Sequence, residues 1–598
     1  MNNRRRKERQ RCDATDATFR RQTFGALGVA ILTVASILTV FVGGERTTAA
    51  NEPTDGAETR PIAVVASAGY DAIWGAAEGV AQALKVAEVV ETVRAIYGDV
   101  QGLDREKPFA VVVATDGSEI VPFAFLPVAS VEKFEFVGVS DLKEKIETTP
   151  EGIFFGDEPR FRLLEKDGWL FVFEEGKEAF VPTTDPTAWL GDEGGKGVLS
   201  VDVDFTAVPE ELLEAGFAAL RQKIAEIAPA DDPSALEEFN ASLEYYSAIF
   251  DSLERVAWTL NVDAATGDLV WKATIVCKDG SPLAETFAGA QNAETRWSAI
   301  AETPNAVWAA VEAGKRSELD REFLAKQQAN AIDKTRLAVE IGLADAEERT
   351  AAEELLVVLE KILTSIAADG TVDAASAFAC DPLLLTTAIA PLDGEETARV
   401  VRMFWERWNE REPENAGKIA KFVKIDAETV GGFNVSKIDV PFAEVEEKIA
   451  PDWAEYWSDK TLAVRWGTSA DAVLLVVGID SAEADAEFAR IAAGAKTKTP
   501  APTRSAFAVA PFGRWASKAL EGNEAAPFAL RKTLERIAEA DDARLEVEYA
   551  IDGDRLDARY VVKSGFFRLI GDVVRSRLAA NIGSGGEGED VDELFEEE

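Results

Sequence analysis

Val256-Ala-Trp-Thr-Leu-Asn-Val-Asp263, followed by Thr266-Gly267 and then by Leu269 to Val276, is the stretch that decides the fold. Apolar and polar side chains alternate along both runs, and a period of two is typical of a half-buried β-strand. Glycine takes the positive φ that a tight turn demands, so Gly267 fits the bend between the runs. The stretch therefore predicts an antiparallel hairpin.

The same pattern returns about 290 residues later, as Leu545 to Asp552, a turn at Gly553, and Leu556 to Val562. Upstream of each hairpin, an apolar run leads into a helix: 198–205 in the first case and 505–512 in the second. We interpret this as a degenerate internal duplication. The sequence predicts an α+β fold with two related units, residues 61–295 and 296–580, each an antiparallel sheet backed by amphipathic helices.

Two further hairpins are expected near the start of the first unit. Asp116-Gly117 separates the apolar runs 109–114 and 120–126, and Asp167-Gly168 separates the runs 153–164 and 169–173. Asp-Gly between apolar runs is a strong hairpin signal, because both residues suit a tight turn.

Helical periodicity marks the segments that should cover the sheets. Apolar residues recur every three or four positions from Leu213 to Ile227 and again at Leu355, Leu359, Ile362 and Ile366. Such spacing places them on one helical face, which we expect to point at the core. Asp345 suits the N-cap of the second helix, and Asp369-Gly370 its end.

The N-terminus has the pattern of an export segment. Eight basic residues within positions 4–21 precede the uncharged apolar run 24–44, so residues after about 45 are expected outside the cytoplasm. Thr48-Ala49-Ala50 would suit a signal peptidase, yet 21 residues are also enough for one membrane-spanning anchor. Residues 1–50 are thus a signal peptide or an anchor, and residues 51–60 a tether.

The rest of the chain is strongly acidic. Residues 51–598 contain 54 basic and 103 acidic residues, a net charge of −49. This charge repels nucleic-acid phosphates, so nucleic acid is excluded as a partner, whereas cations, a cationic protein or an envelope component would be attracted. Eight acidic residues among the last 12 mark residues 581–598 as a disordered tail.

Missing residue types limit the chemistry. The chain has no histidine, which excludes Ser-His-Asp and Cys-His catalysis and histidine-ligated metal sites. Cys12 precedes the apolar run, so only Cys277 and Cys380 remain in the exported part. They form one disulfide or serve as two small buried apolar residues.

Asp202 and Asp204 are the weak candidates for a metal site. They lie two residues apart on an expected strand, so both side chains point to one face. Paired carboxylates bind calcium or act as acid and base in glycoside hydrolysis. Their neighbours in the sequence supply no third ligand at motif spacing. We predict no resident cofactor, with calcium as the one ion considered.

The strand and turn patterns resemble a family of uncharacterised exported proteins of planctomycete bacteria. The resemblance rests on Pro61-Ile-Ala-Val-Val65, on Lys107-Pro108-Phe109 with Ala114-Thr-Asp-Gly117, and on Asp167-Gly-Trp-Leu-Phe-Val172. It implies an extracytoplasmic protein and supports two α+β units. The family has no established activity, so the resemblance assigns no site residues.

These observations favour a secreted or envelope protein that acts by surface contact, as a binding or scaffold protein and not as an enzyme. Two alternatives stay open. One is an extracytoplasmic carrier of an apolar ligand, which would need space between sheet and helices. The other is a histidine-free hydrolase, which would need two converging carboxylates with a raised pKa on one of them.

Overall fold

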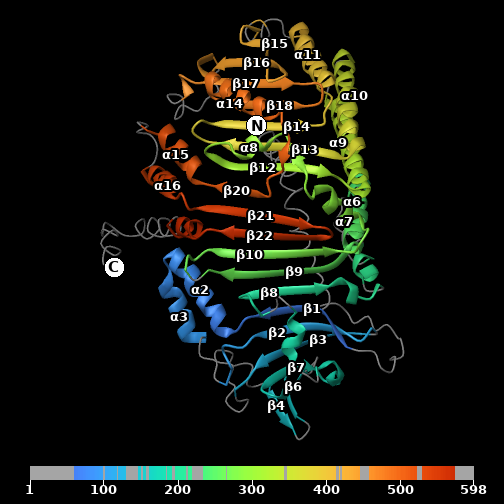
Figure 1. Ribbon diagram of the computed structural model, residues 1–598, viewed down its shortest axis with the longest axis vertical. Coiled ribbons are helices and arrows are strands. Elements are labelled where there is room, and N and C mark those ends of the chain that lie inside the picture. Colours follow the sequence, from blue (N-terminus) through green and yellow to red (C-terminus); the bar gives the residue numbers. More distant parts are fainter. Residues whose placement is uncertain are drawn as a thin grey trace.

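A computed structural model describes residues 59–572 with internal gaps, the longest being 130–145, 223–232 and 445–456. It contains one antiparallel sheet of 20 strands (Figure 1). From the outer edge to the middle, the first half of the sheet has the order β4 (Ile146–Thr149), β5 (Gly152–Phe155), β6 (Phe161–Lys166), β7 (Trp169–Glu174), β3 (Ile120–Pro127), β2 (Phe109–Thr115), β1 (Arg60–Ser67), β8 (Leu199–Asp204), β9 (Leu253–Val262) and β10 (Leu269–Cys277).

The second half continues the same sheet without a break. From the middle to the other edge it has the order β22 (Arg555–Val562), β21 (Arg544–Asp552), β20 (Arg504–Ala508), β12 (Ala306–Lys315), β13 (Thr371–Ala379), β14 (Leu384–Ala390), β18 (Val473–Gly478), β17 (Thr461–Thr468), β16 (Phe433–Pro441) and β15 (Val423–Val430). The β10–β22 ladder joins the halves, so the two predicted units share one sheet.

Both halves have the same strand order. The ten strands of each half can be numbered along the chain, leaving aside the small pair β11 (Glu294–Thr295) and β19 (Thr499–Pro500). Counted outward from the β10–β22 ladder, both halves then have the order 10, 9, 8, 1, 2, 3, 7, 6, 5 and 4. The antiparallel sheet together with its helices confirms the predicted α+β class. A common strand order is what a repeat requires, and descent by duplication stays a prediction.

Helices fill corresponding connections in the two halves. The helices with the bounds used below are α2 (Tyr70–Leu84), α3 (Ala87–Tyr97), α6 (Pro233–Asp251), α7 (Pro282–Ala290), α8 (Ser298–Ala301), α9 (Glu318–Gly342), α10 (Ala346–Asp369), α11 (Gly394–Arg411), α14 (Ser481–Gly494), α15 (Ala510–Ala519) and α16 (Phe528–Glu539). Helices α2 and α3 connect the first two strands of one half, and α9 and α10 connect those of the other.

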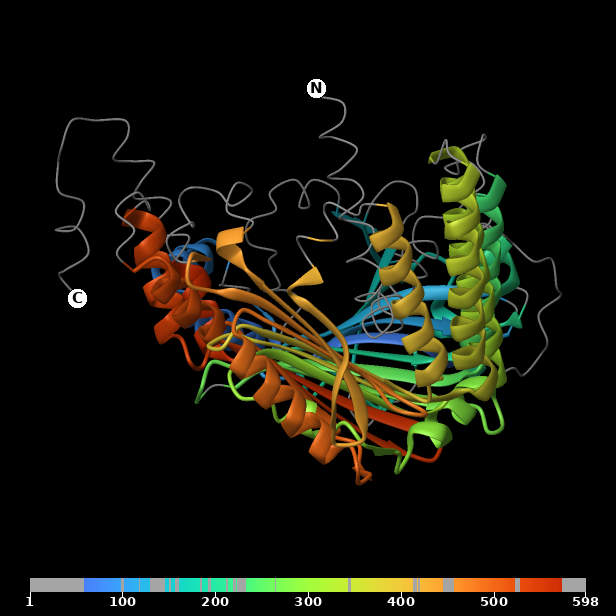
Figure 2. The same ribbon diagram turned by 90° about the horizontal axis from the view of Figure 1, so that it is seen from above.

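The helices define two faces of the sheet. Helices α9, α10, α11, α15 and α16 stand on one side, here called the inner face, and α14 lies on the other, the outer face (Figure 2). On the outer face Phe488 and Ile491 of α14 pack against β17 and β18 in the largest core cluster. Gly467 of β17 permits this contact, because a Cβ there would collide with the Phe488 ring.

A second core cluster lies on the outer face of the first half. Phe123, Phe125 and Phe171 of β3 and β7 pack against the short 3₁₀ helices η2 (Glu178–Phe180) and η3 (Pro186–Leu190). On the inner face, Phe250 of α6 packs against Val201 of β8 near one end of the strands.

Several local expectations are confirmed and others need correction. The hairpins at Gly117, Gly267 and Gly553 form as predicted. The run 153–164 is wrong as a single strand, because it contains β5, β6 and residues 156–160, which lie outside the described part. Helix α10 ends at Asp369 as expected, but Leu359 is exposed, and Leu356 and Val358 are buried in its place.

Two boundaries also differ from the expectation. Helix α15 begins at Ala510, inside the run 505–512 that was expected to be extended. The predicted division after residue 295 cuts β11 from the unit it packs with, because Thr295 pairs with β19 and its hydroxyl donates to Asp373 of β13 at 2.5 Å. Residues 1–58 and 573–598 lie outside the described part, as do the predicted export segment and acidic tail.

Candidate functional site

The inner face carries apolar side chains in register from strand to strand. One row of direct cross-strand neighbours runs from β6 to β21: Leu163, Val172, Ala124, Val111, Val65, Val201, Trp258, Ala273, Ala558 and Tyr549. We call it the first inner row. Alternation in an antiparallel sheet keeps directly opposed residues on one face, so the register alone places all ten together.

A second inner row runs from β10 to β16: Leu269, Val562, Leu545, Phe507, Trp308, Phe378, Leu385, Val477, Val464 and Ile438. Leu269 and Ala273 are four residues apart on β10, so the two rows share a face and are offset along the strands. Neither row contains a charged residue.

Aromatic rings connect the rows in the middle of the sheet. Trp271 of β10 lies between Leu269 and Ala273, and its ring centroid is 5.2 Å from that of Tyr560 and 6.2 Å from that of Trp258. Burial raises the pKa of Tyr560, and burial together with nearby Glu312 raises that of Tyr549. Both hydroxyls therefore stay neutral at physiological pH, and Glu312 of β12 is the charged group beside them on this face.

This face is open to solvent at several points. Among the described residues, the large apolar side chains on strands that are more than a third exposed are Val111, Leu385, Leu462 and Phe507, at 36 to 48%. Val111, Leu385 and Phe507 belong to the inner rows, and Leu462 lies two residues from Val464 on the same face. Exposed apolar side chains gathered on one face indicate a contact surface.

The outer face of the same central strands is charged. Lys272, Arg559, Glu548 and Arg504 follow one another in register across β10, β22, β21 and β20. Arg504 donates to Glu548 at 2.7 Å. The middle of the sheet thus has a charged outer face and an aromatic inner face. Phe507 is 38% exposed, so the inner face is only partly covered there.

Asp202 and Asp204 share one face of β8, as their spacing predicts. It is the outer face, and each carboxylate has a structural partner. The Arg255 guanidinium of β9 forms a bidentate ion pair with Asp202, with Nε to Oδ1 at 2.7 Å. Asp204 caps the 3₁₀ helix η4 (Phe205–Ala207), where it accepts hydrogen bonds from the Thr206 amide at 2.9 Å and hydroxyl at 2.6 Å. Arg255 could not be predicted as the partner of Asp202, because it comes from the neighbouring strand β9, 53 residues along the chain.

The calcium hypothesis gains no third ligand here. Within the part of the chain that the structure describes, no group of three or more Asp, Glu, His or Cys side chains is placed to hold a metal ion. Because Arg255 already neutralises Asp202, a cation at this position would have to displace a guanidinium. Calcium binding therefore stays a prediction without a defined site.

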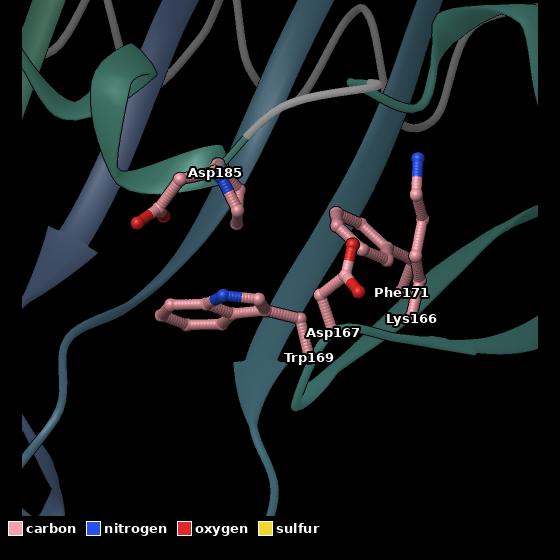
Figure 3. A pocket seen from close by; sticks show the side chains of 6 residues that line it. Lys166, Asp167, Trp169, Phe171 and Asp185 are labelled. Atoms are coloured by element: carbon pink, nitrogen blue, oxygen red, sulfur yellow. The ribbon is translucent and has the colours of Figure 1, made fainter.

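A small pocket of about 280 Å³ lies on the first half, beside the β6–β7 turn (Figure 3). Its walls are Lys166, Asp167, Trp169, Phe171, Asp185 and Pro186. Asp185 caps η3 by accepting from the Thr187 amide at 2.9 Å. The Trp169 ring is itself buried in the adjoining core. The pocket offers mixed charge around two aromatic rings, and one of its two carboxylates, Asp185, has a structural role.

The hydrolase alternative requires a carboxyl with a raised pKa. Glu483 of α14 has one, raised by burial and by Asp480 and Asp381 nearby. Asp480 caps α14, accepting from the amides of Ala482 and Glu483 at 2.8 and 3.0 Å, and Asp381 pairs with Lys518 at 3.4 Å. This cluster is engaged in holding a helix start, and it lies apart from the inner rows.

Comparisons with known proteins add no assignment: no family model matches the chain, and neither a curated protein nor a solved structure matches it. The resemblance to exported planctomycete proteins therefore stays a prediction. In the described residues, no helix is both long and apolar enough to cross a membrane. The candidate site rests on geometry alone, and the inner face is the strongest candidate.

Proposed function

We propose that the protein is an exported, non-enzymatic binding protein that holds a chain-like apolar ligand of the lipid class on its inner face. This takes up the carrier alternative and keeps the extracytoplasmic address that the N-terminal pattern predicts. The acidic exterior keeps such a carrier soluble and leaves it free to meet cationic partners of the envelope.

The observation that carries the proposal is the pair of inner rows, with Val111, Leu385 and Phe507 exposed along them. Twenty strands spaced about 4.8 Å apart give the face a length of about 90 Å. Apolar rows of this length suit an elongated ligand better than a compact one.

The chemistry of the face favours hydrocarbon over polypeptide. The amides and carbonyls of the central strands bond to neighbouring strands, so the face offers side chains and few backbone donors. A peptide on it would lose water from its own backbone polar groups without replacement, which costs free energy, whereas an acyl chain has no such groups.

The test is photolabelling of the full chain with a diazirine-bearing fatty acid, followed by peptide mapping. We expect adducts on strands of the inner rows, above all on β14 and β20. Phe507→Ser combined with Leu385→Ser should reduce labelling at subsaturating probe about thirtyfold, since each truncation removes roughly 1 kcal/mol of apolar contact.

Ala506→Ser is the matched control, because Ala506 is exposed on the same strand and points to the outer face. It should leave labelling unchanged. The proposal fails if adducts map only to residues 24–44, or if Ala506→Ser reduces labelling as much as Phe507→Ser.

A further inference from the structure

The small pocket beside the β6–β7 turn combines polar groups with aromatic rings. Lys166 lies directly opposite Trp169 in the β6–β7 register, and Phe171 is two residues further along β7, so the three side chains share one face of the sheet. Asp185 and Pro186, at the start of η3, line the opposite side of the pocket (Figure 3). The pocket thus lies between a hairpin turn and the start of a short helix, with aromatic rings in its wall.

Trp169 brings a hydrogen-bond donor to this pocket. The residue is only 7% exposed, yet its Nε1–H has no hydrogen-bond partner in the described part of the chain. In contrast to Trp271 Nε1, this nitrogen is reached by solvent. Figure 3 shows it on the edge of the ring that is turned toward Asp185. A Trp buried to this degree usually gives its N–H a partner within the protein, so an open donor at a pocket indicates an acceptor on a ligand.

Two carboxylates line the same pocket with acceptor oxygens to spare. Asp167 has no hydrogen bond or ion pair with any residue that the structure describes. Asp185 uses only Oδ1 for its cap, where it accepts from the Thr187 amide at 2.9 Å and from the Thr187 hydroxyl at 2.8 Å, so its Oδ2 has no partner among the described residues. Figure 3 shows the Lys166 side chain extending away from the Trp169 ring.

We propose that this pocket binds one sugar ring of a saccharide. A hydroxyl group both donates and accepts, so neighbouring hydroxyls can donate to Asp167 and to Asp185 Oδ2 while another accepts from Trp169 Nε1. The aromatic wall suits the C–H groups of a sugar ring, because the face of an aromatic ring carries partial negative charge. An organic cation would satisfy the carboxylates, but it has no acceptor for the indole N–H.

The size of the pocket agrees with a single ring. Its volume of about 280 Å³ lies just below the roughly 300 Å³ at which sites for drug-sized ligands begin. The inference does not rest on the proposed function, because Trp169 and Phe171 belong to the core cluster of the outer face, whereas the inner rows lie on the other face. A saccharide bound here would leave the inner face open.

The test is a titration of the full chain with glucose, galactose, mannose and N-acetylglucosamine, measured by saturation-transfer difference NMR. We expect one or more of these sugars to bind, and Asp167→Asn to weaken binding about fivefold or more, because hydrogen bonds to an ionised acceptor are the stronger kind. The variant should fold, since Asp167 and Gly168 have φ of +53° and +81°, and Asn-Gly is favoured in such turns. Asp185→Asn should act likewise, because Asn keeps the capping acceptor.

Asp116→Asn is the matched control, since Asp116 precedes Gly117 in the β2–β3 hairpin and lies outside the pocket. It should leave sugar binding unchanged. Binding of a neutral sugar should also be the same in about 0.05 M and about 0.5 M sodium chloride, because salt screens only charged ligands. The inference is wrong if none of the four sugars binds, or if Asp116→Asn weakens binding as much as Asp167→Asn. Displacement of the sugar by tetramethylammonium would overturn it in favour of a cation site.

Discussion

Lys272 of β10 lies directly opposite Arg559 of β22, in the ladder that joins the two halves of the sheet. Lys272 is the fourth residue of β10 counted from Leu269, and Arg559 is the fourth of the corresponding run from Leu556. Equivalent positions that pair with each other mark a local two-fold axis perpendicular to the sheet. Both side chains are exposed on the outer face, so two positive charges meet at this axis.

Lys272→Glu should therefore stabilise the protein. Like charges directly opposite one another in a sheet are unfavourable, and an opposite pair contributes about 0.2–1 kcal/mol. Urea unfolding should give a higher midpoint for Lys272→Glu than for the parent chain. Adding Arg559→Glu restores like charges and should remove the gain; a double variant that is as stable as Lys272→Glu would contradict the pairing.

Asp268, in the β9–β10 turn, connects the two halves of the sheet at the end of the β10–β22 ladder where Leu269 pairs with Val562. It accepts hydrogen bonds from the Ser564 amide at 2.8 Å and from Lys563 Nζ at 3.1 Å. Burial alone would raise its pKa, but these bonds outweigh burial and hold the pKa below its ordinary value. A carboxyl with a lowered pKa stabilises the folded state above its unfolded pKa, and this contribution is lost as the pH falls through the folded pKa.

Asp268→Asn should thus cost about 2 kcal/mol near neutral pH, because it removes charge-assisted bonds from a buried group. The difference in melting temperature from the parent should be largest at about pH 6 and shrink toward about pH 3. Asp263→Asn, in the same turn but exposed, is the control and should show a smaller effect. A constant difference across this range would show that the Asp268 charge is unimportant.

Trp271 and Trp297 make a matched pair for stability. Trp297 Nε1 donates to the Asp373 carbonyl at 2.8 Å, whereas Trp271 Nε1 is buried and has no hydrogen-bond partner. Trp297→Phe should cost about 0.5–1.5 kcal/mol, because it removes the buried hydrogen bond to the Asp373 carbonyl. Trp271→Phe removes an unsatisfied donor and should be close to neutral. Equal losses in urea unfolding would mean that ring size decides both cases.

Cys277 and Cys380 should be chemically inert in the native protein. Both are free and buried, and burial raises the pKa of Cys277 to about 12 and that of Cys380 to about 11. Only the thiolate reacts readily, so iodoacetamide near neutral pH should modify neither residue until urea unfolds the chain. Peptide mapping before and after unfolding tests this; a linked Cys277–Cys380 peptide would instead reveal a disulfide.

Local signals in the sequence predict the hairpins well. Gly117, Gly267 and Gly553 each lie where a turn needs positive φ, and each hairpin forms. The β10–β22 ladder could not be predicted, because its strands are almost 290 residues apart and alternation does not identify a partner. Leu359 shows a further limit: helical spacing selects one face of α10, and the sheet buries a neighbouring one.

The candidate site, too, could be predicted only in part from the sequence. Alternation places Trp258 and Leu260 on one face and Thr259 on the other, so a two-faced strand could be read from the sequence. That these residues continue as rows over all the central strands depends on registers that only the fold supplies. Asp202 and Asp204 do share a face, but the Arg255 that occupies Asp202 comes from another strand.

The described chain enters the sheet at β1, four places from the local axis, and leaves it beside β22, at the axis itself. A tether reaching Arg60 would thus hold the molecule off centre, at the seventh of the 20 strands counted from the β4 edge. The β15 edge lies 13 strands from β1 and the β4 edge six, so for the same tilt the β15 edge would move about twice as far. Small rocking motions would then bring either half within reach of the same neighbour, with no hinge inside the protein.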